Sequence, residues 1–168
     1  MTELKTDDND FINQKQFKMT IINNNAPVKC SKTISINASP EKVWNTLTNI
    51  DQWSTWQTDI TKPKISGALL PGTSFVWTSG GATIQSTLQS VDPFNRLGWT
   101  GKTFGIFAIH NWTLTEANNQ TQVAVDESME GLLAKLFKKA FNKSLDKSLQ
   151  TWLDLLKKEC EDVYKRQV

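Results

Sequence analysis

Cysteine and histidine are scarce in this sequence of 168 residues, which contains only Cys30, Cys160 and His110. The two cysteines are far apart and form no Cys-x-x-Cys pair, so neither a disulfide framework nor the usual ligand spacing of a metal site is expected. Free thiols are the rule in the cytoplasm. We therefore expect a cytoplasmic protein that holds no metal and no other cofactor.

An excess of one charge and a long apolar run are also absent. The 19 basic and 17 acidic residues leave a net charge of +2, which gives no reason to expect nucleic acid as a partner. No apolar run reaches about 18 residues, so we expect no membrane span. The N-terminus MTELKTDDND is polar and acidic, unlike a secretory or transit signal. The length fits one domain with a sizeable core.

Three segments differ in composition. Residues 1–27 are rich in Asn, Asp, Lys and Gln and predict a loosely ordered extension, in which only Lys18–Ile22 has the pattern of a short strand. Residues 28–161 carry the periodic patterns of a folded domain. Residues 162–168 form a polar tail.

The domain opens with a strand and two short helices. Lys29–Asn37 alternates between apolar and polar residues, which indicates a strand. Ser39 suits the N-cap and Pro40 the first position of a helix over Pro40–Thr48. A second short helix follows, with Trp53 and Trp56 three residues apart.

Turn residues then predict a long antiparallel meander. Ile60–Ser66 is interrupted by Pro63 and is expected at the sheet edge. The turn Gly80-Gly81 sets Trp77 opposite Ile84. The turn Asp92–Asn95 sets Leu88 opposite Trp99, and Ser90 opposite Leu97.

The next two turns complete the meander. A turn near Thr103-Phe104 would set Trp99 opposite Ala108 and Leu97 opposite His110. Asn accepts positive φ, so Asn118-Asn119 is a plausible two-residue turn, which sets His110 opposite Glu127. All four turns place one set of residues on a single, mostly buried face: Phe75, Trp77, Ile84, Ser86, Leu88, Leu97, Trp99, Ala108, His110, Trp112, Val125 and Glu127.

From Gly131 onward an apolar stripe at helical spacing predicts one helix of about 30 residues. Lysines line much of its other side. A basic amphipathic helix can lie on a membrane surface. We favour core packing instead, because the sheet needs a cover and this is the only long helix available.

The segments ASPEKVWNTLTNIDQWSTW and GLLAKLFKKAFNKSLDKSLQTWLDLLKKE resemble the START-like (SRPBCC) superfamily, and within it the polyketide cyclase/dehydrase-like branch. The resemblance covers about Val28–Glu161. It implies an α+β helix-grip fold, in which a curved antiparallel sheet of about seven strands wraps around the long C-terminal helix and leaves a cavity between them. Relatives bind lipids, polyketides, hormones and quinones, and a few are enzymes, so the fold alone does not settle the function.

Large flat tryptophans beside small residues on the inner face suit a planar or greasy ligand. The alternative is that large and small side chains interdigitate in a filled core. The residues expected to line the cavity are Trp53, Trp56, Phe75, Trp77, Ser86, Leu88, Trp99, Ala108, Trp112, Leu136, Phe137 and Ala140.

The pair of His110 and Glu127 has three interpretations. It can be a structural pair that satisfies two buried polar groups. It can anchor a hydroxyl or carbonyl group of a ligand. It can also act as an acid–base pair in an aldol-type cyclisation or dehydration.

We therefore expect a domain that binds, and in doing so transports or sequesters, a hydrophobic or aromatic small molecule. One alternative is a polyketide cyclase/dehydratase-type enzyme that uses His110 and Glu127. Another is a protein-interaction module of the chaperone-activator type, which a large exposed apolar patch would support. The expected oligomeric state is a monomer or a weak homodimer.

Overall fold

The computed structural model of the protein describes residues 20–162. One antiparallel sheet contains seven strands in the order β1-β7-β6-β5-β4-β3-β2. The strands are β1 (Val28–Ile36), β2 (Ile60–Ile65), β3 (Ser74–Ser79), β4 (Ala82–Asp92), β5 (Arg96–Thr103), β6 (Ile106–Ala117) and β7 (Gln120–Glu130). The helices are α1 (Pro40–Thr48), the 3-10 turn η1 (Ile50–Gln52), α2 (Trp53–Trp56), α3 (Leu132–Leu136) and α4 (Lys138–Asp162).

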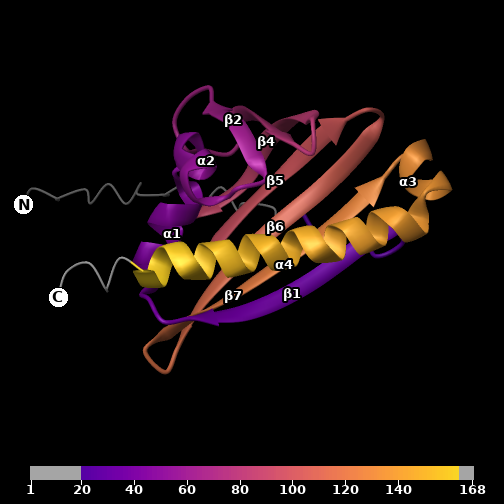
Figure 1. The fold of residues 1–168 in the computed structure, drawn as a ribbon. Helices are drawn as coiled ribbons and strands as arrows, with labels where there is room; N and C mark the ends of the chain where they lie inside the picture. Colours follow the sequence, from indigo (N-terminus) through magenta and orange to yellow (C-terminus); the bar gives the residue numbers. More distant parts are fainter. Residues whose placement is uncertain (1–19, 163–168) are drawn as a thin grey trace, which may run out of the picture.

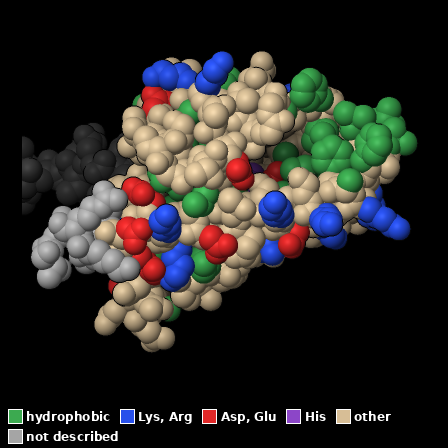
Figure 2. All heavy atoms as spheres, in the orientation of Figure 1, with side chains coloured by type: hydrophobic (Ala, Val, Ile, Leu, Met, Phe, Trp, Pro, Cys, Tyr) green, Lys and Arg blue, Asp and Glu red, His purple; other side chains and the backbone are tan. Residues whose placement is uncertain are grey.

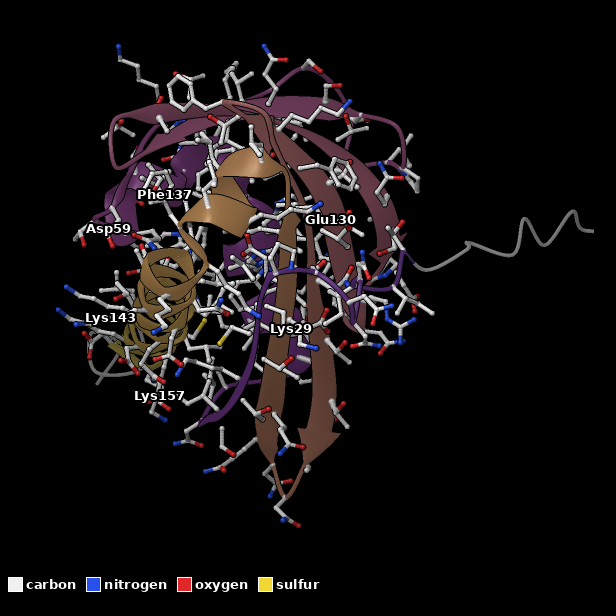
Figure 3. The ribbon with its side chains drawn as sticks, turned by 90° about the vertical axis from the view of Figure 1, so that its right-hand side faces the viewer. Lys29, Asp59, Glu130, Phe137, Lys143 and Lys157 are labelled. Atoms are coloured by element: carbon white, nitrogen blue, oxygen red, sulfur yellow. The ribbon has the colours of Figure 1, made fainter. Side chains whose placement is uncertain are left out.

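The sheet curves around α4, which runs diagonally across its inner face (Figure 1). The view along α4 in Figure 3 shows the strands bending beside the helix. The inner stripe of α4 is buried against the sheet, and its members are Leu145, Leu149, Trp152, Leu153, Leu156 and Cys160. The helix-grip fold expected from the sequence is confirmed.

Helix α1 begins as its sequence predicts. The Ser39 hydroxyl accepts a hydrogen bond from the Lys42 backbone N–H at 3.3 Å, and Pro40 occupies the first turn. Helix α2 then places Trp53 inside the curve of the sheet, where its indole N–H donates to the Leu47 carbonyl at 2.8 Å. These short helices close one end of the space between the sheet and α4.

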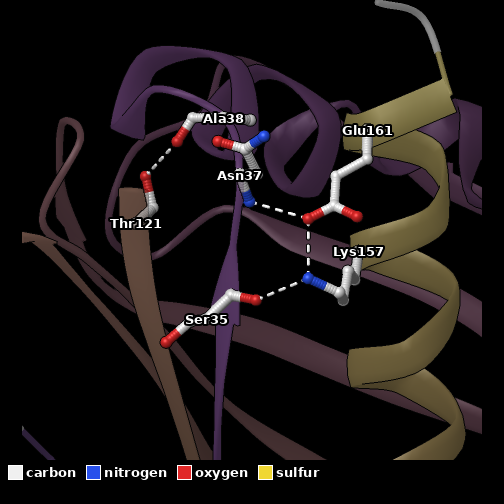
Figure 4. Close-up of polar contacts among 6 residues, drawn as sticks. All are labelled: Ser35, Asn37, Ala38, Thr121, Lys157 and Glu161. Carbon is white, nitrogen blue, oxygen red and sulfur yellow. Dashed lines mark hydrogen bonds and ion pairs between the residues drawn. The ribbon is translucent and has the colours of Figure 1, made fainter. Parts of the chain in front are cut away.

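The C-terminal end of α4 is fastened to β1 by polar contacts (Figure 4). The Lys157 ammonium donates to the Ser35 carbonyl at 2.8 Å and lies 2.6 Å from Glu161 Oε1. The same carboxylate oxygen accepts from the Asn37 backbone N–H at 2.7 Å. This end of the helix is therefore fixed beside α1.

The prediction of a single helix from Gly131 is wrong, because the structure has two helices, α3 and α4, separated at Phe137. Helix α3 starts directly after β7, which ends at Glu130, and it buries only Ala134. Leu132, Leu136 and Phe137 are accordingly exposed. The apolar periodicity continues through Phe137 and gives no sign of this break.

Two of the predicted registers need correction. The β5–β6 turn is Phe104-Gly105, both with positive φ, so Trp99 pairs with His110, and Gly101 with Ala108. The shift of two residues preserves the faces, because side chains alternate with period two. In the β4–β5 pair, Leu88 faces Trp99 as expected, but a bulge follows and Ser90 pairs with Gly98 instead of Leu97.

The registers set by Gly80-Gly81 and Asn118-Asn119 are confirmed, as is the edge position of β2. Before β1, Asn23 contacts two residues of β7. The Asn23 backbone N–H donates to Ser128 Oγ, and the Asn23 side-chain amide donates to Glu130 Oε1. The predicted strand Lys18–Ile22 falls partly outside the described residues, and residues 20–22 form no strand.

Candidate ligand cavity between the sheet and α4

A cavity of about 180 Å³ lies between the inner face of the sheet and α4. Its lining comes from strands β3 to β7 and from α4. The residues are Trp77, Ser79, Ile84, Trp99, Gly101, Thr103, Ile106, Ala108, His110, Glu127, Met129, Phe141 and Ser148. Figure 2 shows the surface hollowed above α4. The cavity lies towards α3, at the end of the sheet opposite α1.

The cavity exists because two small residues face each other at its wall. Gly101 pairs with Ala108 on the inner face, next to the large ring of Trp99. Trp77 forms another wall, and its indole N–H donates to Ser86 Oγ at 3.0 Å. These side chains leave a gap that the neighbouring tryptophans do not fill.

The polar element of the cavity is the pair of His110 and Glu127. His110 Nδ1 lies 2.5 Å from Glu127 Oε2, and the two side chains are only 7% and 11% exposed. The Asn118-Asn119 turn sets this pairing, since both residues adopt positive φ. An ionised carboxylate only accepts hydrogen bonds, so Nδ1 is the donor when Glu127 is charged.

The His110 ring is held by contacts with two tryptophan rings. It stacks on Trp99 with ring centroids 4.3 Å apart and an angle of 9° between the planes. Trp112 contacts it at a tilt, with centroids 5.4 Å apart. The second ring nitrogen, Nε2, is buried and has no hydrogen-bond partner within residues 20–162. A buried nitrogen left unpaired is costly, and a ligand group can satisfy it.

The sequence did not reveal that Cys30 adjoins this pair. Strand β1 places Cys30 opposite Glu127, so Cys30, Glu127, His110 and Trp99 form one row across the sheet. No hairpin turn joins β1 to β7, and therefore no turn residue sets their register. Burial, followed by the charge of Asp146, raises the pKa of the Cys30 thiol. The thiol is therefore kept protonated, which disfavours a nucleophilic role.

Some predicted lining residues lie at the cavity and others fill the core. Trp77, Trp99 and Ala108 line it, together with His110 and Glu127. The residues buried in the core instead are Trp53, Trp56, Phe75, Leu88 and Trp112, with Ser86 buried beside them. Trp53 contacts Trp152 at a centroid distance of 5.1 Å and Trp99 at 5.7 Å. At this end of the fold, the filled-core alternative describes the packing.

Leu136, Phe137 and Ala140 do not line the cavity and are exposed. Phe141, one turn later, lines it instead. Met129 and Ile106 were also missed. Phe141 follows Phe137 at helical spacing and Met129 alternates with Glu127, so their patterns gave a signal.

A larger groove of about 620 Å³ lies beside the Phe104-Gly105 turn. It is open to solvent and contains neither His110 nor Glu127. No group of three or more His, Cys, Asp or Glu side chains placed to hold a metal ion occurs within the described part of the chain. The enclosed cavity is therefore the candidate site.

Comparison with known families matches residues 27–161 to the family described as polyketide cyclase / dehydrase and lipid transport. Comparison with curated proteins gives no match. Among solved structures, a hypothetical protein of Helicobacter pylori is 18% identical with a TM-score of 0.76, covering 85% of this chain and 98% of that one.

Two further solved structures have informative descriptions. The Zhui aromatase/cyclase of a Streptomyces species is 12% identical, with a TM-score of 0.70 and coverage of 79% of this chain and 93% of that one. A START superfamily protein of Mycobacterium smegmatis is 13% identical, with a TM-score of 0.66 and coverage of 80% and 98%. At these identities the similarity establishes the fold only.

Proposed function

Because the chain belongs to the polyketide cyclase / dehydrase and lipid transport family, we propose that it binds a small hydrophobic or aromatic molecule between the sheet and α4. The observation that carries the proposal is the enclosed cavity with tryptophan walls and one buried polar pair. Apolar walls with a few placed polar groups are the usual composition of a ligand site.

The cavity volume limits the ligand. An apolar cavity of about 150 Å³ accepts benzene, whereas drug-sized ligands occupy about 300–1,000 Å³. At about 180 Å³, this cavity accommodates one aromatic ring or a short acyl chain. Larger molecules require Trp77 or Phe141 to move aside.

The unpaired nitrogen of His110 favours a ligand with a polar group. When Nδ1 donates to Glu127, the neutral ring presents Nε2 as an acceptor. A ligand hydroxyl can donate to it. We therefore infer that a phenol or another ring bearing a hydroxyl fits better than a pure hydrocarbon.

A second candidate function is acid–base catalysis, and the short contact of His110 with Glu127 favours it. A carboxylate on Nδ1 fixes the tautomer and orientation that a histidine needs to accept a proton at Nε2. In a β-hydroxy ketone, Nε2 would remove a proton from the carbon between the carbonyl and the carbinol. The electron pair of that C–H bond would form the carbon–carbon double bond as the β C–O bond breaks, and the departing hydroxyl would take the proton back from Nε2 and leave as water. That exchange constitutes an aldol-type dehydration.

The test is uptake of a hydrophobic fluorescent probe, with phenol as the competitor. Replacing Ala108 by Leu adds three carbon atoms to the cavity wall and should lower probe affinity at least tenfold. Ala117→Leu on the same strand is the matched control, since Ala117 is exposed at the hairpin end. Equal probe affinity in the two variants would show that the probe binds elsewhere.

Catalysis is separated from binding by His110→Phe. If the pair is only an anchor, phenol affinity falls and no turnover of a β-hydroxy ketone is detected in the wild type. If the pair is catalytic, the wild type dehydrates the ketone and the variant binds it without turnover.

A further inference from the structure

Four of the eight exposed large hydrophobic residues in the described chain gather at the end of the fold that holds α3. Phe104, Leu132, Leu136 and Phe137 form this apolar patch and are 73%, 70%, 66% and 56% exposed. Figure 2 shows a group of hydrophobic side chains over α3. Exposed apolar side chains in one group are uncommon on a monomer and mark a site of interaction.

The patch is continuous although its residues come from two segments. Gly131 precedes α3 with φ of 126°, and a Cβ there would come within 2.3 Å of the Gly105 carbonyl oxygen. Only glycine permits this approach, which sets the start of α3 against the turn that carries Phe104. In Figure 3, Phe137 and Glu130 lie on opposite sides of α3.

The patch borders the cavity. Thr103 and Ile106, on either side of the Phe104-Gly105 turn, line the cavity. Phe141, one helical turn after Phe137, lines it too, and its backbone N–H donates to the Phe137 carbonyl at 3.0 Å. A partner that covers the patch therefore lies next to the cavity.

The surroundings of the patch are basic. Residues 130–147 contain five lysines, one glutamate (Glu130) and one aspartate, a net charge of +3. The aspartate, Asp146, is already ion-paired with Lys32 at 2.9 Å. Lys135, Lys138 and Lys139 are exposed beside the patch, and Figure 2 shows basic side chains along the adjoining part of α4.

We propose that this apolar patch and its lysines dock on an anionic lipid surface. Apolar side chains enter the boundary between headgroups and acyl chains, while lysines around them attract anionic headgroups. A second copy of the chain is a poorer partner, because it would bring two sets of lysines together. No helix within residues 20–162 is long and apolar enough to cross a membrane, so the contact is at the surface.

The test is flotation with two kinds of vesicle: phosphatidylcholine alone, and equal parts of phosphatidylcholine and phosphatidylglycerol. The protein should float with the mixed vesicles and remain unbound with the neutral ones. Lys138→Gln with Lys139→Gln should reduce partitioning, by about fivefold for each lysine. Leu136→Ser with Phe137→Ser should reduce it at least as strongly.

Matched controls lie elsewhere on the surface. Leu70→Ser removes an exposed leucine between β2 and β3, and Lys158→Gln removes a lysine at the far end of α4. Both should float as the wild type does. Every replaced residue is exposed, so all variants should fold, which thermal unfolding will check.

Two outcomes would overturn the inference. One is flotation that is equal for the patch variants and the controls. The other is a wild type that does not float with the mixed vesicles and sediments as a dimer, while the Leu136→Ser, Phe137→Ser variant sediments as a monomer. The patch would then bind a second copy of the chain. Vesicle binding does not require the cavity, so Ala108→Leu should float normally, and its probe affinity tests the cavity separately.

Discussion

The pair of His110 and Glu127 allows a prediction about stability as well as about function. Replacing Glu127 with Leu leaves His110 Nδ1 buried without a partner, in addition to Nε2. An unsatisfied buried polar group costs about 1–3 kcal/mol. Replacing His110 with Phe keeps a ring against Trp99 but leaves a buried carboxylate unpaired, which costs about 3 kcal/mol or more.

The double variant, His110→Phe with Glu127→Leu, removes both polar groups together. Replacing both partners with apolar groups of similar shape is often nearly neutral, so its stability should lie within about 1 kcal/mol of the wild type. The single costs sum to about 4 kcal/mol or more, so the two substitutions should couple by about 3 kcal/mol or more.

Urea unfolding followed by tryptophan fluorescence measures this coupling. With a slope of about 2 kcal/mol per molar, Glu127→Leu should lower the midpoint by about 0.5–1.5 M and His110→Phe by about 1.5 M or more. The double variant should lower it by at most about 0.5 M. Additive effects, with coupling below about 0.5 kcal/mol, would refute a buried pair. A stable double variant that no longer binds phenol would show that the pair serves binding more than folding.

Two further predictions concern Cys160 and Gly98. Burial raises the pKa of the Cys160 thiol to about 11 from 9.0, so the folded state holds this proton more tightly than the unfolded state does. The stability that this proton contributes is complete below about pH 9 and is lost as the pH rises through 11, a change of roughly 2–3 kcal/mol. Urea midpoints across this pH range should therefore fall more for the wild type than for Cys160→Ala. Equal falls in both proteins would contradict the assignment of the effect to the Cys160 thiol. A Cβ at Gly98 would lie 2.6 Å from both Asn111 Oδ1 and Ser90 Oγ, so Gly98→Ala should lower the unfolding free energy by about 1–3 kcal/mol. Gly101→Ala, whose nearest neighbour would be 3.3 Å away, is the control, and an equal loss in both variants would contradict the steric account.

The sequence predicts the sheet well where turns have strong chemistry. Asn118-Asn119 and Gly80-Gly81 supply positive φ at both turn positions, and the registers that they set are those of the structure. At the third hairpin, a glycine one residue further on decides the turn, so the pairing moved by two while the buried face stayed the same. The alternation of apolar and polar residues therefore identifies which face of a strand is buried, but not which residues of the next strand it pairs with.

The features that the sequence missed depend on contacts between distant segments. The bulge after Leu88 turns Ser90 away from the inner face, and nothing in the alternation signals it. The β1–β7 register that brings Cys30 to Glu127 is set without a turn. The break at Phe137, where φ is −108° and ψ is 30°, has no signal in the apolar stripe, whose helical spacing continues through it.

Native mass spectrometry of the purified protein, followed by organic extraction, tests the central claim most directly. The account predicts one small aromatic or short-chain molecule per chain in the wild type and in Ala117→Leu, and its loss in Ala108→Leu. A wild type that is empty and also takes up neither phenol nor a hydrophobic probe would contradict the account, and the inner face would then be a filled core.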